Sequence, residues 1–584
     1  MLRALRTLGE LLGGPMLHDL VQARYVAVLE FDETGRYLGA ELEPFQAKDV
    51  PRYLYKNAKG SNPPTSTPSL ILNRNQIATS LKNARNAYRK LRPLESSLPP
   101  LDLEDATLWP RMAEDLAQRL QGLPKRERVL LTVRIGGKYM GDREDFRRAL
   151  QALFRQEGRN SLGVAQCAVC GEVKEVSGDI SPFKFYTIDK PGYIVGGFDK
   201  RQAYKAFPLC YDCRDLIQRG RQHVEDNLTF AFAPHMRYML IPDFIFGPEV
   251  LHQEVLDILT TERTQWAQRL HRLKAEELRR ITQDEEDILE VLSEERDVMT
   301  MHFLFIERQQ GKEAIELYIQ DVYPSRLRDL FRAKEIVETL LSRRCVDGSR
   351  YDYTFTYATL HRFFYKSDSN KRNPDLLRHF YELVDRTFRG IPVSDAYLIP
   401  FLIRQIRNDV VQPDRRDQQK AYRFIIQDAL ASFLFVQFTT QKEVVSISTK
   451  GLSTLEAFLD ALPILDIDLK KGLFLLGALT ERLLRVQYSA RNSAPFWKVL
   501  KSLKMTETDL RGLLPKVRNK LQEYDKFGRG EAALFERASY YLAQTSTPWR
   551  LGTDELNFFF ALGMGLFDHI APYIYPQTDE EVSS

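Results

Sequence analysis

Four cysteines in the second quarter of the chain have the residue type and spacing of a metal site. Cys167 and Cys170 form one Cys-x-x-Cys pair, Cys210 and Cys213 form another, and 39 residues separate the pairs. Each pair lets two thiolates reach one ion from a tight turn, and four sulfurs complete a tetrahedral zinc shell. Because four thiolates leave no open coordination position, we expect a structural Zn²⁺. The alternatives are two ordinary reduced pairs or a redox dithiol.

Local signatures of catalysis are missing from the sequence. It has no GxGxxG, GxxxxGK or HExxH motif, so dinucleotide binding, phosphate-loop chemistry and zinc proteolysis lack their usual signals. His18 and Asp19 form an isolated His-Asp dipeptide, and Cys345 has no close partner in the sequence. We therefore expect no enzymatic activity. An active site assembled from distant positions is the alternative, in a metal-dependent nuclease or nucleotide-processing enzyme with a zinc-ribbon accessory domain.

Residues 50–94 form a basic segment that contains no Asp or Glu. Its cations are Arg52, Lys56, Lys59, Arg74, Lys82, Arg85, Arg89, Lys90 and Arg92. On the helix predicted over 75–92, a basic stripe lies beside an apolar one, so the helix packs and still presents cations. Such a row neutralises phosphates without reading sequence. The alternative is a solvated helix face next to a flexible loop.

We predict nucleic-acid contacts from particular residues of this segment. The predicted phosphate contacts are Lys56, Lys59, Lys82, Arg85, Arg89 and Lys90, and Arg52 is a further predicted nucleic-acid contact. Asn57 and Asn62, in the polar loop over 55–72, are the candidates for reading base edges. Tyr53 and Tyr55 offer stacking surfaces.

A second basic region runs from residue 470 to residue 504 and contains one acid, Glu481. The predicted nucleic-acid contacts here are Lys470, Lys471, Arg485, Arg491, Lys498 and Lys501. A basic face on a helical bundle guides a single strand, although an ordinary solvated surface explains the same composition.

The elements around these residues predict an α+β protein. Apolar runs at 25–31 and 129–135 indicate strands, and 75–92 and 143–156 indicate helices. We divide the chain into an α+β region with the basic loop and helix, a zinc-knuckle insertion with its following strands, a mixed and mostly helical region, and a helical carboxy-terminal bundle. The boundaries are 1–160, 161–245, 246–392 and 393–584.

Bulk composition sets further limits. Apolar residues make up 43% of the 584 residues and charged residues 28%, as in ordinary globular proteins. The net charge of +4 does not by itself indicate a nucleic-acid binder, so any basic footprint is local. No stretch of about 18 apolar residues occurs, the amino terminus lacks a signal-peptide pattern, and five cysteines are too few for a disulfide scaffold. We expect a soluble cytoplasmic protein without membrane contact.

Two stretches of sequence carry a family resemblance. The cysteine segment continues as PGYIVGGFDKRQAYKAFPLCYDCRDLIQRG and then MRYMLIPDF. The second stretch is FLLGALTERLLRVQYSARNSAPFWKVLKSLKMTETDLRGLLPKVRNKLQEY, followed by LNFFFALGMGL. Over roughly 160–245 and 470–567 the chain resembles the large subunit of type I-B CRISPR Cascade complexes, the Cas-eight-b or Csh-one family.

The resemblance implies a function in antiviral defence. Such a subunit sits with the other Cascade backbone subunits near the 5′ handle of the CRISPR RNA (crRNA). It recognises the protospacer-adjacent motif (PAM) in duplex target DNA, helps to open the strands and contacts the displaced single strand, while base pairing reads the rest. A separate helicase-nuclease is recruited for cutting. The helical carboxy-terminal region resembles a Cascade small subunit.

Overall fold

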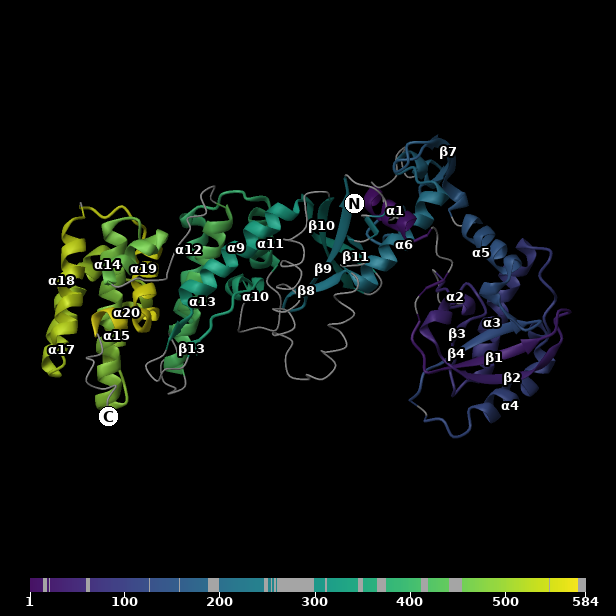
Figure 1. Cartoon of the computed structure of the whole chain (residues 1–584), viewed down its shortest axis with the longest axis horizontal. Helices are drawn as coiled ribbons and strands as arrows, with labels where there is room; N and C mark the ends of the chain where they lie inside the picture. The colour runs from purple at the N-terminus through teal and green to yellow at the C-terminus, as the bar shows by residue number, and fades with distance from the viewer. Residues whose placement is uncertain are drawn as a thin grey trace.

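The computed structural model shows an elongated molecule, with an α/β body at one end and a helical body at the other (Figure 1). A cysteine-bearing hairpin and a four-stranded sheet lie between them. The predicted α+β class is confirmed, since the sheets precede a helical second half. The structure describes all residues except 14–17, 20, 59–62, 125, 157, 187, 189–198, 246–249, 251, 254, 257–258, 260–298, 310–311, 345–349, 365–373, 411–417, 441–453, 546 and 576–584.

The amino-terminal body is a five-stranded sheet with helices packed on it. Its elements are β1 Tyr25–Phe31, β2 Tyr37–Pro44, α2 Val50–Tyr53, β3 Leu70–Ile71, α3 Ile77–Leu91, α4 Trp109–Arg119, β4 Val129–Ile135, β5 Lys138–Tyr139 and α5 Glu144–Gln156. The order is β2-β1-β4-β3, with β5 beside β4. β1 and β4 are parallel neighbours and almost wholly buried, which is why both are continuous apolar runs. Helices α3, α4 and α5 share one core with this sheet.

Hydrogen bonds from its own hydroxyl groups attach the long loop before α3 to the rest of the amino-terminal body. Thr67 Oγ1 donates to the Leu54 carbonyl at 2.7 Å, and Thr65 Oγ1 donates to the Thr67 carbonyl at 2.8 Å. Ser69 lies 2.7 Å from Thr132 of β4, oxygen to oxygen. These hydroxyls are buried, so the described parts of the loop are fastened to the sheet.

The first helix, α1 (Leu2–Leu11), leaves the amino-terminal body and packs on α6 (Tyr211–Asn227) and the sheet beyond it (Figure 1). Its apolar stripe is buried there through Leu5 and Leu8. Glycines permit the close crossing: a Cβ at Gly9 would lie 2.1 Å from the Leu216 carbonyl oxygen, and one at Gly220 would lie 2.0 Å from that of Leu5. Consequently the chain crosses between the two bodies twice, after α1 and after α5.

The central part joins a small hairpin to a larger antiparallel sheet. Its elements are β6 Leu162–Gln166, β7 Val173–Ser177, β8 Thr229–Ala233, β9 Met236–Phe244, β10 Met299–Gln309 and β11 Lys312–Val322, and the larger sheet has the order β11-β10-β9-β8. Between the two cysteine pairs the described residues form one strand, β7, and the described residues of 183–189 form none. The alternating charges of residues 256–296 predict a solvated helical hairpin, and nearly all of this segment lies outside the described residues.

The second half of the chain is helical from α9 onward. Its elements are α9 Pro324–Leu341, β12 Arg343–Arg344, β13 Arg350–Tyr351, α10 Tyr357–His361, α11 Pro374–Arg389, α12 Asp395–Val410, α13 Gln418–Thr440, α14 Leu455–Ala461, α15 Asp468–Arg491, α16 Glu507–Arg511, α17 Leu513–Glu523, α18 Arg529–Ala543, α19 Thr553–Gly565 and α20 Phe567–Ile574. The long helix α15 lies at the centre of the last body, against α18 and α19.

The core of the second half is continuous with that of the central sheet. Phe232 of β8 stacks on Tyr357 of α10 with ring centroids 4.6 Å apart, and Tyr357 meets Phe435 of α13 edge-on at 5.4 Å. The amino-terminal sheet keeps a separate core. The molecule therefore has two main cores, and α1 belongs to the larger one.

Candidate metal centre and nucleic-acid surfaces

The four predicted cysteine ligands converge on one point. All four Sγ atoms lie within 4.8 Å of one another, and those of Cys170 and Cys210 are 4.0 Å apart. Sulfurs of a tetrahedral zinc site with bonds of about 2.3 Å are about 3.8 Å apart. The cluster therefore needs only a slight contraction to hold such an ion.

Local backbone structure positions each pair. Cys167 and Cys170 lie in the turn from β6 to β7, where Gly171 has φ +77° and donates to the Cys167 carbonyl at 2.9 Å. An L side chain is strained at that φ, which explains the glycine. Cys210 is the cap of α6, and its Sγ accepts the backbone N–H of Cys213 at 3.4 Å.

The surroundings shift the pKa values of the thiols in opposite directions: hydrogen bonding to Cys210, followed by burial, raises the pKa of the Cys213 thiol. Hydrogen bonding from Cys213, with a smaller contribution from its backbone N–H, lowers the pKa of the Cys210 thiol to about 5. Burial raises the pKa of Cys170. A bound cation deprotonates the remaining thiols, since metal ligation requires thiolates. Four cysteines within ligand distance thus form a possible metal site, and the donor set fits a closed structural ion.

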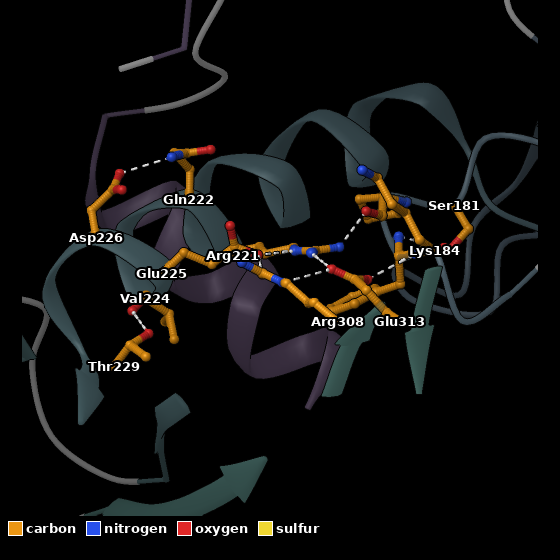
Figure 2. Close-up of polar contacts among 12 residues, drawn as sticks. Ser181, Lys184, Arg221, Gln222, Val224, Glu225, Asp226, Thr229, Arg308 and Glu313 are labelled. Atoms are coloured by element: carbon orange, nitrogen blue, oxygen red, sulfur yellow. Dashed lines mark hydrogen bonds and ion pairs between the residues drawn. The ribbon is translucent and has the colours of Figure 1, made fainter. Parts of the chain in front are cut away.

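Figure 2 shows how the segment after the hairpin is anchored to the central sheet. The Glu313 carboxylate of β11 accepts the Lys184 backbone N–H at 2.9 Å and pairs with Arg221 of α6. Arg221 also donates to the Pro182 carbonyl and lies over the ring of Phe183, 4.5 Å from its centroid. Breaking an ion pair between a buried cation and its carboxylate costs free energy, so residues 182–184 stay attached to α6 and the central sheet.

On α3 and directly after it, some of the basic side chains are exposed without an ion pair and others are engaged by neighbouring groups. Lys82 and Lys90 are exposed, and neither has an ion pair within the described part of the chain. Arg85 lies over the ring of Trp109, 4.8 Å from its centroid. Arg89 is 3.8 Å from Glu104, which also binds Arg92 at 2.7 Å. The helix thus presents two ammonium groups without an ion pair among the described residues and two engaged guanidinium groups, and Arg92 directly after it is also engaged.

In and beside the loop, most of the described residues that were predicted to contact nucleic acid already bind carboxylates of the protein. Lys56 is only 5% exposed, and its Nζ lies 2.6 Å from Asp19 Oδ1. The same carboxylate accepts the backbone and side-chain N–H groups of Asn57 at 2.9 and 3.0 Å. Arg52 pairs with Asp142 at 3.1 Å. Lys59 and Asn62 lie outside the described residues.

In the second basic region, acids on the same helix, in the connection before it and on other helices neutralise four of the six predicted cations. Lys470 is buried, 2.8 Å from Asp466, and Lys471 is 2.6 Å from Asp460. The other pairs are Arg485 with Glu481 at 2.8 Å and with Asp568 at 2.5 Å, and Lys501 with Asp509 at 2.6 Å. Arg491 and Lys498 are exposed without an ion pair among the described residues. Because residues 470–504 contain one acid, their composition overstates the positive charge that remains without an ion pair in this region.

Three protein-family models match consecutive parts of the chain. They describe the CRISPR-associated protein TM1802 amino-terminal domain over residues 1–152, its central domain over 164–322 and its carboxy-terminal domain over 355–578. The chain belongs to this CRISPR-associated TM1802 family. The family inferred from the sequence resemblance is thereby confirmed. No curated protein matches the chain.

The amino-terminal domain of this TM1802 protein is not a single packed unit, because α1 lies within its matched range and packs on the central domain. The metal-site cysteines fall in the central domain, and the second basic region falls in the carboxy-terminal domain. Among the described helices, none is both long and apolar enough to cross a membrane.

Sequence reasoning missed a set of free cations in the carboxy-terminal domain. They follow the end of α15 and continue through α17 to the start of α18, are exposed, and form no ion pair with any described residue: Lys504, Lys516, Lys526 and Arg529. Lys516, Lys526 and Arg529 lie outside the acid-poor interval because acids such as Glu523 and Asp525 are close in sequence. No local signal separates a paired cation from a free one when the partner comes from another helix.

Proposed function

We propose that this TM1802-family protein is the non-catalytic large subunit of a type I-B Cascade complex. The observation that carries the proposal is the match of three CRISPR-associated domain models along nearly the whole chain. In this role the chain binds beside the crRNA and other backbone subunits, recognises the PAM in duplex DNA, helps to unwind it and recruits a separate helicase-nuclease for antiviral defence. The cysteine centre then holds Zn²⁺ as a structural ion in a cytoplasmic protein.

The free cations supply the electrostatic part of this function. Lys82 and Lys90 on α3 offer phosphate contacts to duplex DNA. In the carboxy-terminal domain, Lys498, Lys504, Lys516, Lys526 and Arg529 are exposed and offer contacts to the displaced single strand. Arg491 is exposed as well and lies over the ring of Tyr524, 5.2 Å from its centroid. Ammonium groups that are not paired within the protein gain most from a phosphate, because no internal ion pair has to be broken.

The test is binding of a target duplex by the crRNA complex assembled with and without this chain, across salt concentrations, with cleavage measured in the same samples. The proposal requires PAM-dependent, salt-sensitive binding without cleavage. Divalent-metal-dependent cleavage by the chain alone would instead establish the rival, a nuclease or nucleotide-processing enzyme with a zinc-ribbon domain.

A charge-matched pair of variants locates the duplex contact. Lys82→Ala with Lys90→Ala removes two free cations, and the slope of log K against log salt should fall by about 0.9 for each lost phosphate contact. Lys471→Ala with Lys501→Ala removes the same charge from lysines that already pair with aspartates at 2.6 Å, so the slope should stay nearly unchanged. Equal slopes for both variants would remove α3 from the duplex interface.

A further inference from the structure

The hairpin β6–β7 has one face that no described part of the chain covers. In its register Val164 is opposite Glu175 and Gln166 is opposite Val173, so these four side chains share a face. Val164 is 75% exposed and Val173 is 73% exposed, more than any other large apolar side chain of the described chain. We call these four residues the valine face.

The opposite face of the hairpin is packed. Val176 is buried, and a Cβ at Gly163 would lie 2.4 Å from the ring of Tyr204, which comes from the 3₁₀ helix Lys200–Lys205. The turn at one end of the hairpin carries Cys167 and Cys170. After the other end come residues 182–184, where Lys184 is bound to Glu313 (Figure 2) and the Pro182 carbonyl accepts from Arg221. The valine face is thus presented on a fixed support, which lowers the entropy lost on binding.

The charge around the hairpin disfavours nucleic acid. Residues 161–180 contain Glu172, Glu175 and Asp179 against Lys174 alone. Lys174 already pairs with Glu172 at 2.7 Å and with Asp212 at 3.4 Å. A zinc ion with four thiolates adds a formal charge of about −2. The hairpin itself therefore carries a net negative charge, and a protein surface with Lys or Arg beside apolar groups is complementary to it.

We propose that the valine face is a docking surface for a separate protein subunit, whose apolar side chains cover Val164 and Val173 and whose cation pairs with Glu175. The hairpin lies at the outer edge of the molecule, where β7 projects beside α6 (Figure 1). Two β-branched side chains exposed together on one rigid face mark an interaction site more strongly than single exposed apolar residues do. The inference rests on the proposed function in one respect, the membership of this chain in a multi-subunit complex.

The experiment compares variants of the full chain in the complex assembled with crRNA and its co-expressed protein subunits. Val164→Thr with Val173→Thr removes apolar contact while keeping β-branched shape, and Glu175→Lys reverses the charge. Leu38→Thr on β2, where Leu38 is 62% exposed, is the control for loss of an exposed aliphatic group. Zinc content and hydrogen exchange of residues 162–177 are measured with and without the other subunits, together with affinity for each subunit.

We expect assembly to protect residues 162–177 from exchange, and both hairpin variants to weaken binding of one protein subunit by about tenfold or more, with zinc content and the Leu38→Thr control unchanged. Unaltered subunit affinity in both variants overturns the docking surface. Pairing of the isolated chain with itself through this face, or binding of single-stranded DNA to it, also overturns it. If no guided complex forms with any variant, the failure lies in the proposed function and not in the hairpin.

Discussion

At the scale of single side chains, the partner of each group decides its chemistry. Cys210 becomes a strong candidate ligand because α6 begins at it and supplies an N–H to its sulfur. Lys56 and Lys470 are buried beside carboxylates, whereas Lys82 and Lys90 face solvent. The same residue type thus serves either as an internal counter-charge or as a free cation for a phosphate.

Replacing a ligand should release the metal. Cys210→Ser removes the thiol with the lowered pKa, so zinc should fall from about one ion per chain to a small fraction of that. Cys345→Ser is the control, since this cysteine has no close partner in the sequence, and its zinc content should equal that of the wild type. Elemental analysis of the purified chains makes the comparison. Full zinc in Cys210→Ser would contradict the four-cysteine site.

His18 should make stability sensitive to acid. Burial, with a smaller contribution from the Lys56 cation, lowers the pKa of His18 from 6.5 to about 4. The unfolded chain binds this proton near pH 6.5 and the folded chain does not, so the stabilisation is complete above that pH and is lost as the pH falls toward 4. Relative to His18→Gln, the wild type should lose about 2 kcal/mol between about pH 7 and about pH 5. Parallel unfolding curves at the two pH values would contradict this.

At the scale of elements, close helix crossings depend on glycine. Gly9 and Gly220 let α1 and α6 meet backbone to backbone. Gly477 and Gly563 do the same for α15 and α19. A Cβ at Gly477 would lie 1.9 Å from the Phe560 carbonyl oxygen, and one at Gly563 would lie 1.7 Å from that of Phe474. Such crossings are specific because any larger residue forces the helices apart.

Gly9→Ala should loosen α1. The added Cβ meets backbone, which cannot rotate away as a side chain can, so we expect a cost of about 1–3 kcal/mol. Glu10→Ala, one residue further, removes only a partly exposed pair with Arg6 and should cost no more than about 0.5 kcal/mol. Hydrogen exchange of Leu2–Leu11 measures both. Similar protection in the two variants would show that the crossing tolerates a methyl group.

At the scale of the whole molecule, the chain is organised by two cores that do not follow the sequence order. The amino-terminal sheet has its own core, while α1 shares the core of the central and helical parts. The amino-terminal body is therefore linked to the rest by two segments, one before β1 and one after α5. This arrangement limits rotation of that body more than a single linker does.

The separate core predicts an independent folding unit. A chain of residues 21–156, which lacks α1, should fold cooperatively because its apolar contacts are internal. A chain of residues 1–156 should add no stability and should self-associate more, since the apolar face of α1 has lost α6. Thermal unfolding and sedimentation compare the two. A higher unfolding temperature for the longer chain would show that α1 also stabilises the amino-terminal body.

The sequence by itself determined the features that depend on local pattern. The two Cys-x-x-Cys pairs predicted the four cysteines that converge in the structure, because the spacing is a property of the turn. The apolar runs 25–31 and 129–135 gave β1 and β4 to the residue, since strands buried on both faces are continuous apolar segments. Family membership also followed from short stretches around the cysteines and α15.

Only the tertiary structure decided which cations form no ion pair within the described chain and against which body α1 packs. Lys470, Lys471 and Arg485 stand in an acid-poor interval, yet Asp466, Asp460 and Asp568 neutralise them from other segments. The amphipathic pattern of α1 predicts a buried face but not the surface that buries it. Ion pairs and helix crossings join residues far apart in the chain, and their free energy depends on distances that the order of residues does not specify.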